Sequence, residues 1–596
     1  MHESVNPIDD STRERPRISN NAIPLLPDAS IIEELLRNER ERLEKEHGIA
    51  KKPAEHFARP MENLFTRDQR ETTTILFGGL TWKHDVLIQS MLEGLGYKCR
   101  ALETADVHAF QIGKEYGNNG QCNPTYFTVG NLVHELQKLE AQGMSREEII
   151  DSHVFFTAGA CGPCRFGMYE AEYRLALRNS GFEGFRVLIF QQTGGLNQAE
   201  IEAGLEMNLD FFLGILNAMN IGDLLNDLAY QIRPFEIEEG ATDRALRASI
   251  DIMKAKLKER KLFNVTKNPL FEKLSFLKNP VETIGKFIDQ LASDTLVDAM
   301  RQCRDLFAQI QVDRLRVRPI VKVTGEFWAQ TTEGDGNFNM FSFLQREGAQ
   351  VLVEPIATWI MYMLHQVKQE ATDRKGLELD KSKSGLAFAS EKFTSTLQYR
   401  KRMATYTLAE KLFKREYYRL RAALNDMPHE LTDQYELQRI AHPYYNTRAE
   451  GGEGHLEVAK NIYYTNKDLC HMVLSVKPFG CMPSSQSDGV QSAVTSHYKE
   501  IIYLPIETSG EGEINAHSRV QMALGEARTK AKTEMSELLR KHSVTMEELQ
   551  AFVAQHPQMQ SATLKIPHRK GAVSVAANFA LYVLERMNKQ HARVAA

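Results

Sequence analysis

The sequence has no long apolar run, no strongly basic segment and few cysteines. Its 596 residues are 42% hydrophobic and 25% charged, and the formal net charge is −5. This composition is typical of an ordinary globular protein, and the length predicts more than one domain. Because no apolar run approaches the length of a bilayer-spanning helix, we expect no membrane partner. The absence of basic runs also argues against a nucleic-acid-binding surface.

The first 30 residues lack the apolar core of a signal peptide, which predicts a cytoplasmic protein. Seven cysteines in a cytoplasmic chain do not indicate a disulfide framework, so ligation, catalysis and burial are the alternatives for these thiols. The sequence also has no Gly-x-x-x-x-Gly-Lys-Ser/Thr loop. We therefore do not expect the chain to hydrolyse ATP.

Short apolar runs alternate with segments of helical spacing along most of the chain. Residues 99–102, 154–156 and 185–191 have the pattern of buried strands, whereas 83–95 and 127–139 have the pattern of helices. Such alternation predicts an α/β fold with parallel sheets. A second α/β unit begins near Arg318, and mainly helical segments separate it from the first.

The predicted domain organisation has five parts. They are a polar arm with a charged helix (1–66), a first α/β domain (67–235), a helical connector (236–315), a second α/β domain with a helical insertion (316–540) and a C-terminal helical tail (541–596).

The stretch 155–170 contains the sequence Cys161-Gly162-Pro163-Cys164 between an apolar strand and a predicted helix. A helix N-terminus and free backbone N–H groups stabilise a thiolate in such a loop. The tetrapeptide alone is compatible with a dithiol redox pair, half of a zinc site, or two ligands of an iron–sulfur cluster.

Cys122 and Cys481 lie in similar surroundings. For each of them we predict a strand, a Gly- and Pro-rich loop, the cysteine, and a proline soon after. Loops of this kind gather at the carboxyl ends of the strands in an open α/β sheet, where ligands bind. The pattern favours iron–sulfur ligation by Cys122, Cys161, Cys164 and Cys481, with zinc and a thioredoxin-like dithiol as alternatives. We predict that the other three cysteines are ordinary buried thiols, namely Cys99, Cys303 and Cys470.

Several long segments resemble one protein family. They are 74–82, 117–127, 159–169, 478–484 and 571–579. The family comprises large proteins related to the 2-hydroxyglutaryl-CoA dehydratase activator, whose C-terminal half is similar to the dehydratase subunits and to benzoyl-CoA reductase. The resemblance implies tandem Rossmann-like domains that hold a [4Fe-4S]-type cluster, with Cys122, Cys161, Cys164 and Cys481 at the ligand positions. Relatives include double-cubane cluster reductases.

The resemblance also implies partners. Long relatives carry ATPase domains before this region, whereas here only a polar arm of about sixty residues precedes it, so we expect a separate ATPase activator to deliver low-potential electrons in trans. An acyl-CoA is the expected substrate of a dehydratase- or reductase-type component. The alternative is an electron carrier or scaffold with no substrate of its own.

Two strand ends and one loop give weaker signals. Glu326 and Glu507 follow predicted strands and are candidate acid–base groups or supporting partners at the functional edge. The Gly-rich loop 449–455 precedes a predicted helix, whose N–H groups suit an anion such as a CoA phosphate. A plain helix-start loop and solvated carboxylates are the alternative interpretations.

Overall fold

The computed structural model describes residues 29–47, 62–159, 164–191, 204–259, 293–377, 379, 382, 384–449, 451–510 and 512–595. The chain divides into two units, 1–59 and 60–596. The first unit contains the helix α1 (Ala29–Glu46), which confirms the charged helix predicted between residues 31 and 47. All other described elements belong to the second unit.

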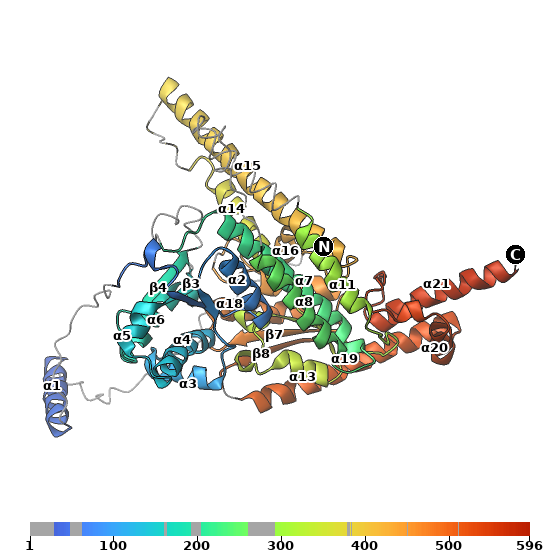
Figure 1. Cartoon of the computed structure of the whole chain (residues 1–596), viewed down its shortest axis with the longest axis horizontal. Helices are drawn as coiled ribbons and strands as arrows, with labels where there is room; N and C mark the ends of the chain where they lie inside the picture. The colour runs from blue at the N-terminus through green and yellow to red at the C-terminus, as the bar shows by residue number, and fades with distance from the viewer. Residues whose placement is uncertain are drawn as a thin grey trace, which may run out of the picture. The chain divides into compact units, whose positions relative to one another are not determined.

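The second unit contains two four-stranded parallel sheets (Figure 1). The first has the order β2-β1-β3-β4 and the second the order β6-β5-β7-β8. The strands of the first sheet are β1 (Thr74–Phe77), β2 (Cys99–Ala101), β3 (His153–Gly159) and β4 (Arg186–Gln191). Those of the second are β5 (Ile320–Gly325), β6 (Gln350–Leu352), β7 (Met472–Pro478) and β8 (Tyr503–Thr508). The predicted α/β fold with tandem parallel sheets and helical insertions is therefore confirmed.

Helices surround the sheets and connect them. In and after the first sheet these are α2 (Trp82–Gly94), α3 (Val107–Tyr116), α4 (Asn123–Ala141), α5 (Arg146–Ser152), α6 (Tyr169–Asn179), α7 (Leu209–Ile232), α8 (Ala241–Lys258) and α11 (Thr295–Ala308). With the second sheet come α12 (Phe327–Thr331), α13 (Met340–Arg346), α14 (Ile356–Asp373), α15 (Gly385–Ala423), α16 (Gln434–Ala441), α17 (Leu456–Asn466), α18 (Met482–His497) and α19 (Glu513–His542). The chain ends with α20 (Met546–Ala554) and α21 (Val575–Ala595). Short 3₁₀ turns lie at η1 (Arg67–Gln69), η2 (Arg165–Met168), η4 (Arg233–Phe235), η6 (Asp335–Asn337) and η7 (Pro557–Gln560).

Three of the four central strands are buried along their length. Every residue of β1, β5 and β7 is buried, including polar side chains such as Lys322 and Ser475. Several helices begin at residues whose side chains satisfy their free N–H groups. Thr81, for example, caps α2 by accepting a hydrogen bond from the backbone of His84.

One large apolar cluster packs the first sheet against helix α7 and against helices that come after the second sheet begins. Side chains of the first sheet and α2, such as Ile75 and Leu87, belong to the same buried apolar cluster as Ala357 of α14 and Tyr417 of α15. The second sheet adds its own cluster around Val321 and Leu474. The finer domain boundaries stay a prediction, since residues 60–596 form one unit.

The strand order defines where a ligand fits. In each sheet the strand that comes first in the chain, β1 or β5, lies between the second and the third strands. The chain therefore passes to opposite sides of this strand, and the strand order reverses between β1 and β3 and between β5 and β7. In open parallel sheets a crevice forms at the carboxyl ends of two such strands. The loops that follow β3, β5 and β7 contain Cys164, Glu326 and Cys481.

Within the described ranges, no helix combines the length and apolarity needed to cross a bilayer.

Candidate functional site

Three of the four predicted ligands directly precede a helix or a 3₁₀ turn. Cys122 precedes α4, Cys481 precedes α18, and Cys164 precedes the turn η2. Prolines in the first turn of α4 and of α18 fix the backbone after Cys122 and Cys481. None of the three side chains caps its own helix, so the thiols are available to a ligand near the positive ends of the helices. Cys161 lies outside the described residues.

One expectation about Cys122 is wrong. The sequence suggested that a strand directly precedes its loop, but helix α3 lies between β2 and this loop. The apolar spacing of 107–116 belongs to a helix that packs against α4. Cys122 therefore reaches the site from the start of α4, not from the end of a strand.

Loops from the two sheets meet at these cysteines. The backbone N–H of Asn123 donates to the carbonyl oxygen of Phe479 at 3.2 Å. A Cβ on Gly480, which has φ +76, would lie 3.6 Å from Cys122 Cα. A Cβ on Gly452, which has φ +67, would lie 3.8 Å from Cys164 Cβ. The fold thus brings together three thiols that are far apart in the sequence.

The same Gly452 Cβ would come within 2.6 Å of Pro483 Cγ. Such an approach is shorter than any real Cβ contact, and a positive φ is strained for other residues. Glycine at position 452 lets the Gly-rich loop pass between Cys164 and the start of α18.

Side chains connect the Cys122 loop to the Cys164 loop. Cys122 Sγ lies 3.2 Å from Thr125 Oγ1 and 3.3 Å from the hydroxyl of Tyr169, which begins α6 directly after η2. Arg165 donates from Nη1 to the carbonyl oxygen of Gly120. These contacts fix the two loops with respect to each other.

Buried carboxyl groups lie beside the thiols. Glu326 caps α12 by accepting from the backbone N–H groups of Trp328 at 3.1 Å and Ala329 at 2.9 Å. Glu453 accepts from the backbone N–H of Phe327 and is 2% exposed. The start of α12 is therefore occupied by carboxyl groups of the chain itself.

Glu457 holds the start of α18. Its carboxylate accepts hydrogen bonds from Ser484 Oγ at 2.7 Å and from Ser487 Oγ, and it pairs with Lys477 Nζ at 3.4 Å. Lys477 also pairs with Asp488, and these partners raise its pKa against the effect of burial. This buried network orients the helix that begins at Cys481.

The acidic groups of the site oppose one another's ionisation. Burial raises the pKa of Glu326 to about 7, and burial with the charges of Glu326 and Glu457 raises the pKa of Glu453 well above its ordinary value. Burial raises the pKa of Cys122. Burial and the charge of Glu453 raise the pKa of Cys164 to about 12. The pKa of Cys481 is raised by burial and by the charges of Glu326 and Glu453.

A cationic centre would remove this conflict. Three thiols and two carboxyls in one buried place cannot all ionise in water-poor surroundings unless positive charge is supplied. Thiolates are the soft ligands that iron–sulfur clusters use, so this donor set fits such a group. For a single ion the finding is different: among the described residues, no three His, Cys, Asp or Glu side chains are placed to hold one metal ion.

The other candidate residues fall into two groups. Glu507 lies on the exposed side of β8, so the structure does not bring it into the buried cluster with Glu326. Cys99, Cys303 and Cys470 are buried, and burial raises their pKa to about 12, 11 and 12 respectively. These three behave as predicted for ordinary buried thiols.

The Gly-rich loop does not present a simple anion site. It turns through positive φ at Gly451, Gly452 and Gly454 and leads into α17. Glu453 and Glu457 lie at this helix start and are buried. A phosphate group would meet both carboxyls there, which is unfavourable.

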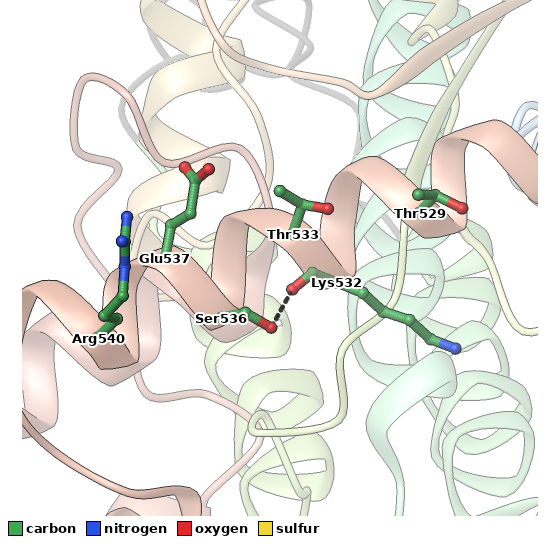
Figure 2. A pocket seen from close by; sticks show the side chains of 6 residues that line it. All are labelled: Thr529, Lys532, Thr533, Ser536, Glu537 and Arg540. Carbon is green, nitrogen blue, oxygen red and sulfur yellow. Dashed lines mark hydrogen bonds between the residues drawn. The ribbon is translucent and has the colours of Figure 1, made fainter.

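A separate surface pocket lies on α19, and no cysteine lines it. It has a volume of about 330 Å³ and is lined by Thr529, Lys532, Thr533, Ser536, Glu537 and Arg540 (Figure 2). Ser536 Oγ donates to the carbonyl oxygen of Lys532 at 2.9 Å. A single helix supplies all the lining residues, so this pocket is a depression of the surface, without thiols or buried acids.

No protein-family model matches the sequence, and no curated protein matches it at a significant level.

Proposed function

We propose that the protein binds a [4Fe-4S]-type cluster through Cys122, Cys164 and Cys481, with Cys161 as the fourth candidate ligand. The observation that carries the proposal is the meeting of three thiols, from loops of both sheets, at helix N-termini. When bound, such a cluster supplies one-electron transfer at low potential.

Within this proposal, the chain belongs to the type of the 2-hydroxyacyl-CoA dehydratases and benzoyl-CoA reductases. A separate ATPase activator would deliver the electrons, an acyl-CoA would be the substrate, and a double-cubane centre is the variant form. This assignment rests on the sequence resemblance together with the tandem parallel sheets, because a fold alone does not define a reaction.

The chain's own residues would hold protons beside the centre. With a pKa of about 7, Glu326 retains a proton over much of the neutral range, and Glu453 retains one at higher pH. Both carboxyls lie next to the thiols and are anchored by the start of α12. Reductions and dehydrations consume or release protons, and these two groups are placed to exchange them.

A dithiol oxidoreductase is a further alternative, in which Cys122 and Cys481 would have no role. The attacking residue of a Cys-x-x-Cys pair is its first cysteine, and here this residue is Cys161, which lies outside the described residues. An electron carrier that uses the same cluster without a substrate of its own is the alternative function.

The test is anaerobic purification followed by iron, sulfide and zinc analysis and electron paramagnetic resonance of the dithionite-reduced protein. We expect about four irons and four sulfides per chain and a reduced-cluster signal. Cys122→Ala, Cys164→Ala and Cys481→Ala should each lower the iron content, whereas the matched variant Cys303→Ala should not. Stoichiometric zinc, or metal-free protein with a Cys161–Cys164 disulfide, would contradict the proposal.

A further inference from the structure

The long helix α15 carries a row of exposed apolar side chains, which we call the outer stripe. Its members and their exposed fractions are Leu386 (91%), Phe393 (71%), Leu397 (57%) and Leu408 (58%). The three leucines are eleven residues apart. Eleven residues make almost exactly three helical turns, so the row runs straight along the helix without drifting around it.

The opposite face of α15 is already occupied. Lys368 of α14 pairs with Glu410 of α15 at 2.7 Å, and Lys375 lies 4.8 Å from the ring centre of Tyr399. Further along, Phe413 and Tyr417 are buried in the large core cluster. Helix α15 is thus fixed by α14 and by its C-terminal end, and Figure 1 shows it extending beside α14. The outer stripe is the face that α14 leaves uncovered.

Charges of one sign flank the outer stripe. Arg400 and Lys401 lie on either side of it, and Lys411 and Arg415 lie in line with it just beyond Leu408. Within the described part of the chain, no carboxylate forms a salt bridge with any of these four. Glu391 and Glu410 lie on the α14 side of the helix, where Glu410 is paired with Lys368 and Lys414. The uncovered face is therefore a narrow apolar row with positive charges beside it and at its C-terminal end.

We propose that the outer stripe binds an acidic amphipathic helix of a partner protein. The four apolar side chains cover an arc of only about 60° at 3.6 residues per turn. A seam of this width is typical of helix–helix packing, whereas a helix that lies on a membrane presents a broader apolar face. The flanking lysines and arginines select glutamate or aspartate on the partner helix.

The same charges disfavour pairing of two copies of this chain through the stripe. Two α15 helices placed seam to seam would bring their basic flanks against each other, and like charges across an interface are destabilising. The inference is independent of the cysteine site, because no residue of the stripe contacts that site in the described structure.

The test uses full-length protein and a fluorescent synthetic helix with leucines every eleven residues and glutamates beside them. Fluorescence anisotropy should show binding that weakens as salt increases. The double variant Phe393→Glu/Leu397→Glu should weaken binding about tenfold or more, because it places charge in the centre of the seam. The matched control is Ile514→Glu/Met522→Glu on α19, where two apolar side chains are similarly exposed. It should bind like the unmodified protein, and circular dichroism should show all variants folded.

Four outcomes would overturn the proposal. The first is that the same peptide with lysines in place of its glutamates binds equally well. The second is that the original peptide binds the Phe393→Glu/Leu397→Glu variant as well as it binds the unmodified protein. Another is a dimer in sedimentation experiments that this variant dissociates, which would assign the stripe to a second copy. The last is binding to phosphatidylserine vesicles that is lost in this variant, which would assign it to a lipid surface.

Discussion

Asp85 is a buried carboxyl group in the first turn of α2, 6% exposed. Burial raises its pKa from 3.8 to about 7, and hydrogen bonds from the backbone of Leu80 and Gly79 oppose part of this increase. The group therefore keeps its proton in the folded protein at a pH where the unfolded chain has already lost it. Proton binding by the folded state makes stability fall as the pH rises from about 4 to about 7.

The variant Asp85→Asn should remove this pH dependence, because an amide of the same shape does not ionise. Relative to the unmodified protein, we expect the variant to gain about 2–3 kcal/mol of stability between pH 5 and pH 8, at 1.36 kcal/mol per unit of pKa. Urea unfolding midpoints measured across this range provide the comparison. If the stability of the two proteins changed with pH in the same way, Asp85 would be ionised in the folded state, which would contradict the prediction.

At the residue scale, sequence reasoning found the thiols and Glu326, but not the other acids beside them. The Gly- and Pro-rich loops around Cys122 and Cys481 have a local signature, and the structure confirms that both residues begin a helix. Glu453, in the glycine-rich loop, and Glu457, in the first turn of α17, have no such signature. The local sequence around such a carboxylate is the same whether the side chain is solvated or buried. Only the packing of this loop against Pro483 and Cys164 makes it a buried acidic cluster.

At the scale of elements, Asp223 of α7 joins three helices. Its carboxylate accepts from the backbone N–H groups of Ile356 and Ala357 at the start of α14, both at 2.8 Å. It also lies 3.2 Å from Nε2 of His84 in α2, whose Nδ1 lies 2.7 Å from Thr81 Oγ1. The Asp223 carboxylate thus accepts hydrogen bonds from the first N–H groups of α14 and also contacts the buried imidazole of His84.

Replacement of Asp223 by alanine should destabilise the protein by about 3–5 kcal/mol, because it leaves buried donors without an acceptor. Asp298→Ala is the matched control: this aspartate pairs with Arg301 on the exposed face of α11, and loss of such a surface pair should cost less than about 1 kcal/mol. Thermal and urea unfolding measure both effects. If the two variants lost equal stability, the buried contacts of Asp223 would not be important.

Most element positions follow from the sequence, but lengths and contacts do not. Apolar runs located the central strands, and the predicted helix 83–95 corresponds to α2 within one or two residues. The sequence pattern does not give the length of the 39-residue helix α15, since polar residues continue a helix when a neighbour such as α14 supports one face.

At the scale of the whole molecule, neither half contains the complete site. Cys122 and Cys164 belong to the part before residue 316, whereas Cys481, Glu326 and Glu453 belong to the part after it. The large core also combines side chains from both parts. Local sequence patterns could not predict this meeting, because it depends on how the two sheets pack.

Expression of residues 60–315 and 316–596 as separate chains should therefore yield fragments that bind little iron on their own. Co-expression should restore binding in part, because the shared core can re-form from two chains. Iron analysis after anaerobic reconstitution measures the outcome, with the intact chain as reference. If fragment 60–315 alone held the full iron content, Cys481 would not be needed.

The two sheets have the same strand order, yet they contribute different chemistry to the site. Because both sheets are parts of one chain, the two sides of the site can differ, whereas a symmetric homodimer would supply identical ligands from both sides. Here the first half supplies Cys122 and Cys164, and the second supplies Cys481 together with the buried carboxyls. A single chain can therefore place donors and acids on opposite sides of the same site.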